Sequence, residues 1–264
     1  MLKFGMPTLI EAADIASCAA LCHELGLDFI ELNMNLPQYQ PDAVDTDRLG
    51  QLGEQYGIGY TIHLDENMDA CEFNPYVADA YLRTVKESIA LAKKLRAPLL
   101  NMHLSRGVYF TLPQGKVYLY AQYKEQYLQK IAAFRDACEC EIGKSDIKIC
   151  IENCNGWQDF QKDAIDVLLA SPVFALTLDV GHNHGSGGED GAFILSRKER
   201  LQHMHLHDAQ GKKDHLALGT GEVDIPYYLT LAGEVCQTVV LESKTIASLR
   251  ASVAALSSLS STPR

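Results

Sequence analysis

The sequence lacks the features that mark several large classes of protein. It has no run of about 18 consecutive uncharged apolar residues, so we expect no membrane-spanning helix and no membrane partner. Cysteine is scarce, with 8 in 264 residues, and no Cys-x-x-Cys pair occurs, which indicates reduced thiols rather than a disulfide scaffold. Basic charge is also scarce: 23 Lys and Arg against 34 Asp and Glu leave a net charge of −11, which disfavours a nucleic-acid partner.

The sequence also shows no pattern typical of a targeting segment or of a linker between domains. Glu11 and Asp14 come before any long apolar region, so we expect no secretory signal and a cytoplasmic protein. Composition does not change along the chain, which predicts one domain over residues 1–256. Residues 257–264 are rich in serine and are predicted to form a disordered tail. Whether the chain forms a homo-oligomer is left open.

The sequence does contain a regular alternation of short apolar segments and longer amphipathic ones. Candidate strands recur about every 33 residues, at 2–6, 29–34, 59–64, 99–104, 147–153, 174–180, 201–207 and 238–243. Apolar residues at three- and four-residue spacing predict helices between them, among them 12–25, 77–95, 118–141, 163–170 and 246–256. Eight strand-and-helix units in a chain of this length predict an α/β fold, a single-domain (β/α)8 TIM barrel.

A glycine-rich segment at 181–191 follows the sixth candidate strand. It contains no clean G-x-G-x-x-G spacing, and the first candidate strand carries no such motif, so a dinucleotide site is disfavoured. We interpret the segment as a mobile loop.

Polar residues stand near the carboxyl ends of most candidate strands. In a barrel these ends form the face that carries the active site. Strand side chains alternate between two faces, so the aliphatic neighbours of each polar residue indicate that the polar one points to the barrel axis. The residues placed in this way are Glu31, Asn33, His63, His103, Glu152, Asp179, His205 and Glu242.

Four of these residues form a candidate metal site. Carboxylates brought together in one cavity repel one another unless a cation neutralises them. Three carboxylates and one imidazole suit Mn²⁺, Mg²⁺ or Co²⁺ and are less typical of structural zinc. We therefore expect a divalent metal, Mn²⁺ first and Mg²⁺, Co²⁺ or Zn²⁺ as alternatives, bound by Glu152, Asp179, His205 and Glu242.

Further residues are candidates for contacts with substrate. Trp157, the only tryptophan, suits the wall of a sugar site, although core packing explains it equally well. His203 is interpreted as a buried, hydrogen-bonded residue, and His207 as a residue at the rim of the site. The substrate-binding candidates are His63, His103, His182, His207, His215, Trp157 and Lys212.

Several motifs together resemble a known family. They are Ile151-Glu152-Asn153, Leu178-Asp179-Val180-Gly181-His182, His205-Leu206-His207-Asp208, Leu218-Gly219-Thr220-Gly221 and Leu241-Glu242-Ser243. Their order and spacing resemble the xylose isomerase-like TIM barrel superfamily over essentially the whole chain. That superfamily contains sugar-phosphate isomerases and epimerases, ketose 3-epimerases, inosose and dehydroshikimate dehydratases, and the endonuclease IV enzymes of AP endonuclease family 2. The resemblance implies the same four metal ligands, with His63, His103 and His182 as further site residues.

Several positions depart from the patterns of individual members, two of them as follows. Gln158 stands where ketose 3-epimerases tend to carry a second glutamate. Lys213 stands where endonuclease IV carries the aspartate of its Asp-x-His motif, two residues before His215.

The leading hypothesis is an isomerase or epimerase that transfers a proton α to a carbonyl. Its substrate would be a small sugar, a polyol ketone or a sugar phosphate, with Glu152 and Glu242 as the catalytic acid and base. A dehydratase of an inosose- or dehydroshikimate-like substrate is the first alternative. The others are an endonuclease IV-like phosphodiester hydrolase, in which histidines hold additional zinc ions, and an inactive barrel that only binds ligands.

Overall fold

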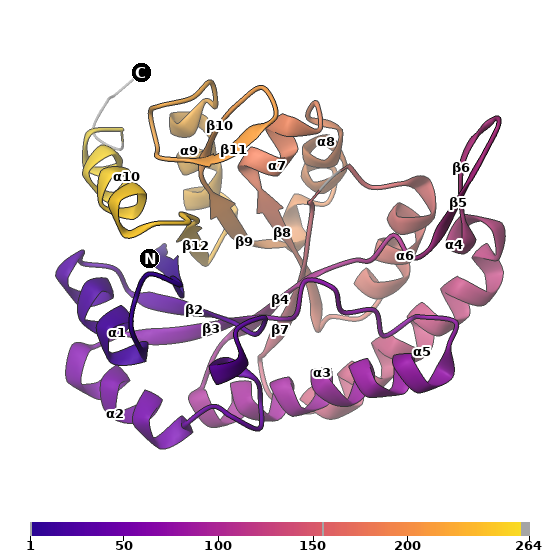
Figure 1. The fold of residues 1–264 in the computed structure, drawn as a ribbon, viewed down its shortest axis with the longest axis horizontal. Helices are drawn as coiled ribbons and strands as arrows, with labels where there is room; N and C mark the ends of the chain where they lie inside the picture. Colours follow the sequence, from indigo (N-terminus) through magenta and orange to yellow (C-terminus); the bar gives the residue numbers. More distant parts are fainter. Residues whose placement is uncertain (1, 155, 260–264) are drawn as a thin grey trace.

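The computed structural model describes residues 2–154 and 156–259. Within these ranges eight parallel strands close into one barrel, running β1, β2, β3, β4, β7, β8, β9, β12 and back to β1 (Figure 1). The strands are β1 (Lys3–Pro7), β2 (Phe29–Asn33), β3 (Gly59–His63), β4 (Leu99–His103), β7 (Lys148–Glu152), β8 (Phe174–Asp179), β9 (Leu201–Leu206) and β12 (Thr238–Leu241). Each of them overlaps a segment predicted as a strand, and only β1 extends past its segment, by one residue, so the predicted (β/α)8 barrel is confirmed.

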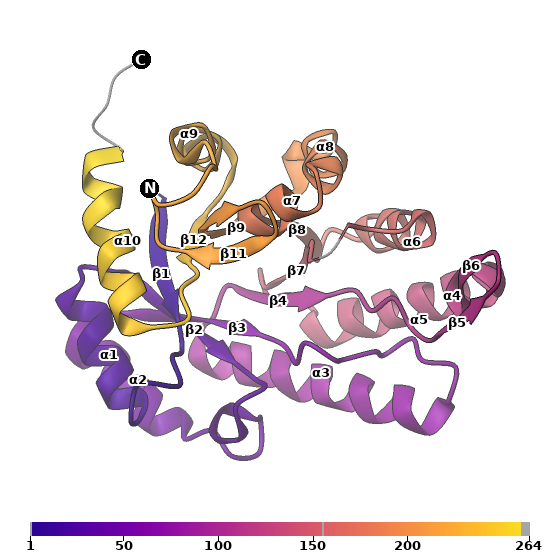
Figure 2. The same cartoon turned by 45° about the horizontal axis from the view of Figure 1, so that its top comes forward.

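The helices lie around the outside of this barrel (Figures 1 and 2). They are α1 (Ile15–Glu24), α2 (Thr46–Tyr56), α3 (Pro75–Leu95), α4 (Leu119–Gln122), α5 (Lys124–Ile142), α6 (Asp159–Leu169), α7 (Val180–Gly185), α8 (Glu189–Leu195), α9 (Ile225–Val235) and α10 (Ile246–Leu259). Local sequence explains several helix starts: the side chains of Asp14, Asp45 and Asn74 each accept a hydrogen bond from a backbone N–H in the first turn. Single turns of 3-10 helix occur at Pro37–Tyr39 and Lys198–Arg200.

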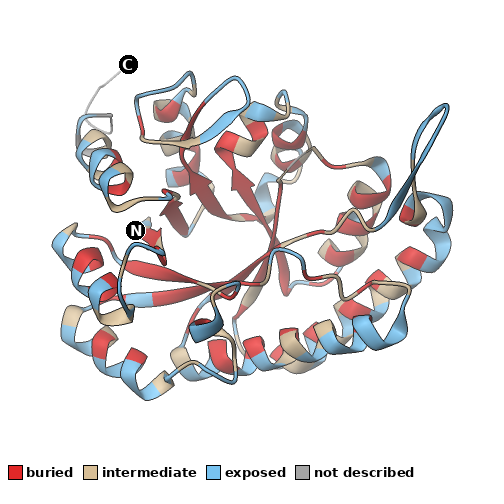
Figure 3. Ribbon diagram, viewed as in Figure 1, coloured by how far each residue is buried: buried red, intermediate tan, exposed pale blue. Residues whose placement is uncertain are grey.

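The protein has two buried regions of different chemistry, one between the strands and the helices and one along the barrel axis. Aliphatic strand residues such as Ile62, Leu178 and Met204 are 0% exposed and belong to the apolar core between strands and helices. The alternate residues point to the axis, where Glu31 and Thr177 are also buried. Burial extends over the strands and the inner faces of the helices (Figure 3). The polar axial interior is what the candidate site is built on.

We expect the apolar interior to carry most of the stability. Leu178→Ala should cost about 2 to 5 kcal/mol, because it removes buried methyl groups and leaves a cavity. Leu112→Ala, at a leucine that is 41% exposed, is the matched control and should cost much less. The midpoints of denaturant-induced unfolding compare the two, and equal losses would contradict this assignment of the core.

Two antiparallel hairpins extend beyond the barrel strands, and neither was predicted. One joins β5 (Tyr109–Leu112) to β6 (Gly115–Tyr118), and the other joins β10 (Asp208–Gln210) to β11 (Lys213–Leu216). The first projects away from the barrel beside α4 (Figure 2). The helix predicted over 118–141 is divided, because Tyr123 leaves the helical conformation between α4 and α5.

The prediction of a mobile loop over 181–191 is wrong, because this segment forms α7 and the start of α8. The Asp179 side chain accepts the backbone N–H of His182 and so starts α7. Gly187 and Gly188 form the bend between the helices with φ of 83° and 86°. The amide oxygen of Asn183 then accepts the N–H of Gly191 at 2.7 Å, which joins the two helices.

The carboxyl-terminal helix is longer than expected. α10 ends at Leu259, three residues past the boundary at 256, and the Ser258 hydroxyl donates to the carbonyl of Ala255 at 2.7 Å within the last turn. The rest of the predicted tail, 260–264, lies outside the described residues. All eight cysteines are free, as predicted. Among the described residues, no helix is both long enough and apolar enough to cross a membrane.

Candidate metal centre and active site

The four residues predicted as metal ligands lie together at the carboxyl end of the barrel. Glu152 ends β7, Asp179 ends β8, His205 lies on β9, and Glu242 directly follows β12. One ligand atom from each lies within 4.8 Å of the others. Strand register explains the convergence: Asp179 pairs with His205, and Glu152 pairs with Thr177, two residues before Asp179. A period of two then puts these side chains on the same face of the sheet.

The imidazole of His205 lies between the carboxylates. Its Nδ1 atom lies 3.2 Å from Glu152 Oε1, 3.2 Å from Glu242 Oε2 and 3.9 Å from Asp179 Oδ2. Burial alone would raise the pKa of the Glu152 and Glu242 carboxyls, but His205 beside them outweighs it and holds each pKa well below its usual range. Both carboxylates are therefore ionised at neutral pH.

The donor set fits a divalent cation. His205 Nδ1, His182 Nδ1 and Glu242 Oε2 are buried and have no hydrogen-bond partner in the described part of the chain. Unpartnered buried polar atoms are costly, so a cation that they share would explain them. The second nitrogen of His205, Nε2, lies 2.9 Å from Glu31 Oε1, the usual arrangement for a metal-bound histidine oriented by a carboxylate.

Glu31 was predicted to point to the axis, but its role in the site was not predicted. Its Oε2 accepts the Thr61 hydroxyl at 2.9 Å and lies 3.2 Å from His203 Nε2. Burial opposes ionisation, yet His205 and His203 lower the pKa of the Glu31 carboxyl far below its usual value. His203 is buried and hydrogen-bonded as expected, with Nδ1 2.6 Å from the Thr238 hydroxyl. The alternation in β2 was the only signal for Glu31.

His63 and His103 lie beside the second carboxylate oxygen of Glu152, Oε2. Each places Nε2 3.3 Å from Glu152 Oε2. His63 Nδ1 lies 2.8 Å from the carbonyl oxygen of Leu64, so it carries a proton, and Nε2 faces the carboxylate. Burial lowers the pKa of His63, but Glu152 raises it more, to about 9. The amide of Asn101 also donates to Glu152 Oε2 and was not predicted.

His182 and His215 form a third group with Asp214. His182 Nε2 lies 3.5 Å from Asp214 Oδ2, and His215 Nδ1 lies 2.8 Å from Asp214 Oδ1. His215 Nε2 lies 3.1 Å from Glu242 Oε1, so this group adjoins the four-residue centre. Asp214 comes into the site although Lys213 occupies the position where the related motif has its aspartate.

Two substrate-binding candidates, His207 and Lys212, are placed differently from expectation, whereas Trp157 fits both interpretations given to it. His207 is not at the rim: it is 1% exposed and donates to Asp179 instead. Trp157 lines the cleft but is only 5% exposed, because its ring packs against Phe193. Lys212 is exposed at the turn between β10 and β11 and lines neither cavity described below.

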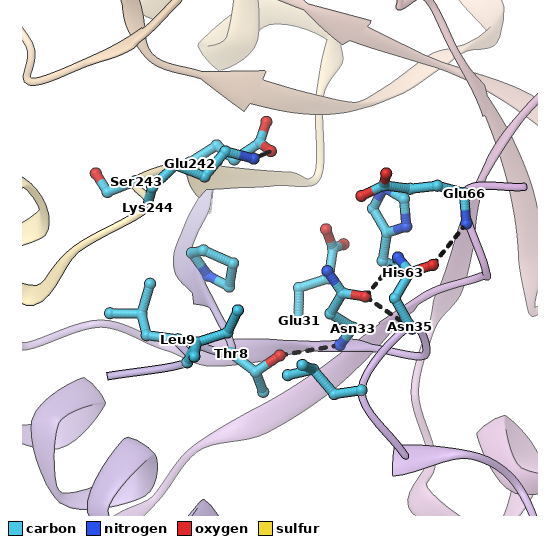
Figure 4. A pocket seen from close by; sticks show the side chains of 13 residues that line it. Thr8, Leu9, Glu31, Asn33, Asn35, His63, Glu66, Glu242, Ser243 and Lys244 are labelled. Carbon is cyan, nitrogen blue, oxygen red and sulfur yellow. Dashed lines mark hydrogen bonds and ion pairs between the residues drawn. The ribbon is translucent and has the colours of Figure 1, made fainter. Parts of the chain in front are cut away.

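The cleft above the centre consists of two adjoining cavities of about 420 and 490 Å³. They share His63, Glu66, Glu242 and Lys244. Figure 4 shows the smaller one, in which Glu31, His63 and Glu242 border the same space. Thr8 and Asn35, which were not predicted, also line the cleft, as do Asn33, Arg106 and Lys244. Cavities of this size suit a small molecule.

Comparisons with known proteins agree with this architecture. Residues 19–246 match a family model described as xylose isomerase-like TIM barrel. An uncharacterized protein of Methanocaldococcus jannaschii is 24% identical over 246 residues, covering 87% of this chain and 83% of the relative. A solved D-tagatose 3-epimerase-like protein has a TM-score of 0.79 at 19% identity and covers 97% of this chain and 96% of its own. The IOLI protein with a bound zinc atom has a TM-score of 0.73 at 14% identity, covering 97% of both chains.

Proposed function

Since the chain belongs to the xylose isomerase-like TIM barrel family, we propose that it is a divalent-metal-dependent isomerase or epimerase. Its substrate would be a small sugar, a polyol ketone or a sugar phosphate, and Mn²⁺ is the metal we expect. The observation that carries the proposal is the placement of two carboxylate side chains, Glu152 and Glu242, each 3.2 Å from the same nitrogen of His205. Both also line the cleft.

The two carboxylates supply what proton transfer requires. A cation held by Glu152, Asp179, His205 and Glu242 would polarise the substrate carbonyl and acidify the neighbouring C–H. Glu152 and Glu242 come from β7 and from the end of β12, on either side of β8 and β9. One can therefore take the α proton while the other returns a proton to the opposite face of the carbon. The likeness to a D-tagatose 3-epimerase-like protein supports this reaction class.

Solvent exchange tests the proposal directly. Incubation of the Mn²⁺-loaded protein in heavy water with ketoses and ketose phosphates should place deuterium on the α carbon of the product, as read by proton NMR. The converse experiment uses a substrate labelled with deuterium at that carbon. A product that retains the whole label would contradict exchange through the carboxylates. A substrate analogue without the carbonyl is the control and should not exchange.

A second candidate is phosphodiester hydrolysis, and one observation favours it. His63 and His103 beside Glu152, and His182 and His215 around Asp214, offer ligands for additional cations. The charge of the chain opposes this function. Arg106 and Lys244 are the arginine and lysine side chains that line the two cavities, and the net charge is −11. A duplex-binding enzyme must neutralise several phosphates.

We therefore expect no nicking of a duplex that contains an abasic site at physiological salt, and fewer than three bound metals per chain. Gel analysis of the labelled duplex and elemental analysis of the purified protein measure these outcomes. Efficient nicking that falls steeply with added salt and is lost in His182→Ala would favour the hydrolase over the isomerase.

A further inference from the structure

We propose that His207 is a positioning residue that holds Asp179 in one orientation toward the cation, and that residue 181 is glycine to make room for its ring. The inference rests on the metal centre of the proposed function but is independent of the substrate. It gives His207 a role in the centre instead of the contact with substrate that the sequence suggested.

The hydrogen bonds of His207 define where its proton lies. The backbone N–H of His215 donates to Nδ1 at 2.8 Å, so the neutral ring carries its proton on Nε2. Nε2 lies 3.0 Å from Asp179 Oδ1 and 3.1 Å from Oδ2, so its N–H points to the carboxylate.

Other residues hold the backbone of Asp179 and one of its carboxylate oxygens, Oδ1. The Asn153 side chain makes two hydrogen bonds to the backbone of Asp179, from Nδ2 to the carbonyl at 3.0 Å and from the Asp179 N–H to Oδ1 at 2.9 Å. The N–H of His182 donates to Oδ1. His207 lies nearly equidistant from the two oxygens, so it restrains rotation of the carboxylate plane.

The imidazole is itself confined by its neighbours. The ring of His215 stacks on it with 4.3 Å between centroids and 3° between planes. A Cβ atom at Gly181 would lie 2.1 Å from His207 Cε1 and 2.3 Å from Nδ1, far inside contact distance. Gly181 has no positive φ, so backbone conformation does not require glycine there. Glycine is required because the imidazole of His207 occupies the space that a Cβ atom would take.

Metal affinity is the measurement that tests this role. In the full chain, His207→Leu removes the donor, and we expect Mn²⁺ affinity measured by isothermal titration calorimetry to fall about 10- to 100-fold. His207→Gln, whose Nε2 can occupy the position of the imidazole Nε2, should restore most of that affinity. The absorption bands of bound Co²⁺ should shift in the leucine variant and remain near those of the parent in the glutamine variant. His23→Leu, at an exposed histidine far from the site, should change neither readout.

Gly181→Ala provides a second route if the leucine variant does not fold. The added methyl group displaces the ring, and the expected result is the same fall in Mn²⁺ affinity with His207 still present. Parent-like affinity and an unchanged Co²⁺ spectrum in both His207→Leu and Gly181→Ala would overturn the positioning role alone. A parent chain that binds neither metal would overturn the proposed function and this inference together.

Discussion

Glu152→Gln and Glu242→Gln should each lower turnover by at least about 10² to 10⁴-fold, the range that loss of a general acid or base produces. Each change also removes a negative charge from the cation site, so the larger figure is the one we expect. Glutamine preserves the size of the side chain, and its amide can keep some of the polar contacts to His205. The loss therefore reports on charge and proton transfer rather than on packing.

Steady-state kinetics with saturating Mn²⁺ measures this effect on the substrate that the exchange experiment identifies. Glu54→Gln, an exposed glutamate on α2, is the matched control and should keep parent turnover. Circular dichroism establishes that the variants are folded. Parent-level turnover in either site variant would remove that carboxylate from the mechanism.

Removal of the metal should abolish activity and lower the thermal stability of the chain. A ligand present at 100 times its dissociation constant stabilises the native state by about 2.7 kcal/mol. For a chain of this size that corresponds to roughly 5 to 10 °C in melting temperature. Without the cation, the carboxylates of Glu152, Asp179, Glu242 and Glu31 lie close together, and neighbouring imidazoles and Lys244 compensate only part of their charge. Addition of Mn²⁺ or Co²⁺ should restore both properties.

Differential scanning calorimetry before and after dialysis against a chelator measures the shift, with activity assayed on the same samples. An Asp179→Asn variant should show a smaller shift, because one anionic ligand is lost. Folded parent protein whose melting temperature and activity do not respond to chelation would contradict the metal centre.

The barrel could be predicted because its strands are continuous apolar segments between amphipathic helices. The convergence of Glu152, Asp179 and His205 could be predicted for the same reason, since each follows aliphatic residues at a strand end. Parallel topology then brings the three ends to one face. This part of the site needs only strand order and side-chain alternation.

Features that leave no apolar pattern in the sequence could not be predicted. The hairpin β5–β6 has strands of four residues, and all four of β5 are exposed, so no apolar alternation marks it. The helices in the glycine-rich segment depend on the Asn183 contact to Gly191 and on the cap from Asp179. The burial of His207 depends on a missing Cβ at Gly181, which a sequence pattern does not reveal.

The column of polar side chains beneath the metal centre bears on how this barrel can be redesigned. Thr238 contacts His203, His203 contacts Glu31, and Glu31 contacts His205. A change at Thr238, in the first position of β12, is therefore connected to a proposed ligand through two side chains. Protein engineers who treat the interior of a barrel as inert scaffold would alter the chemistry of this one. Its stability can be improved on the helical shell, where the column does not reach.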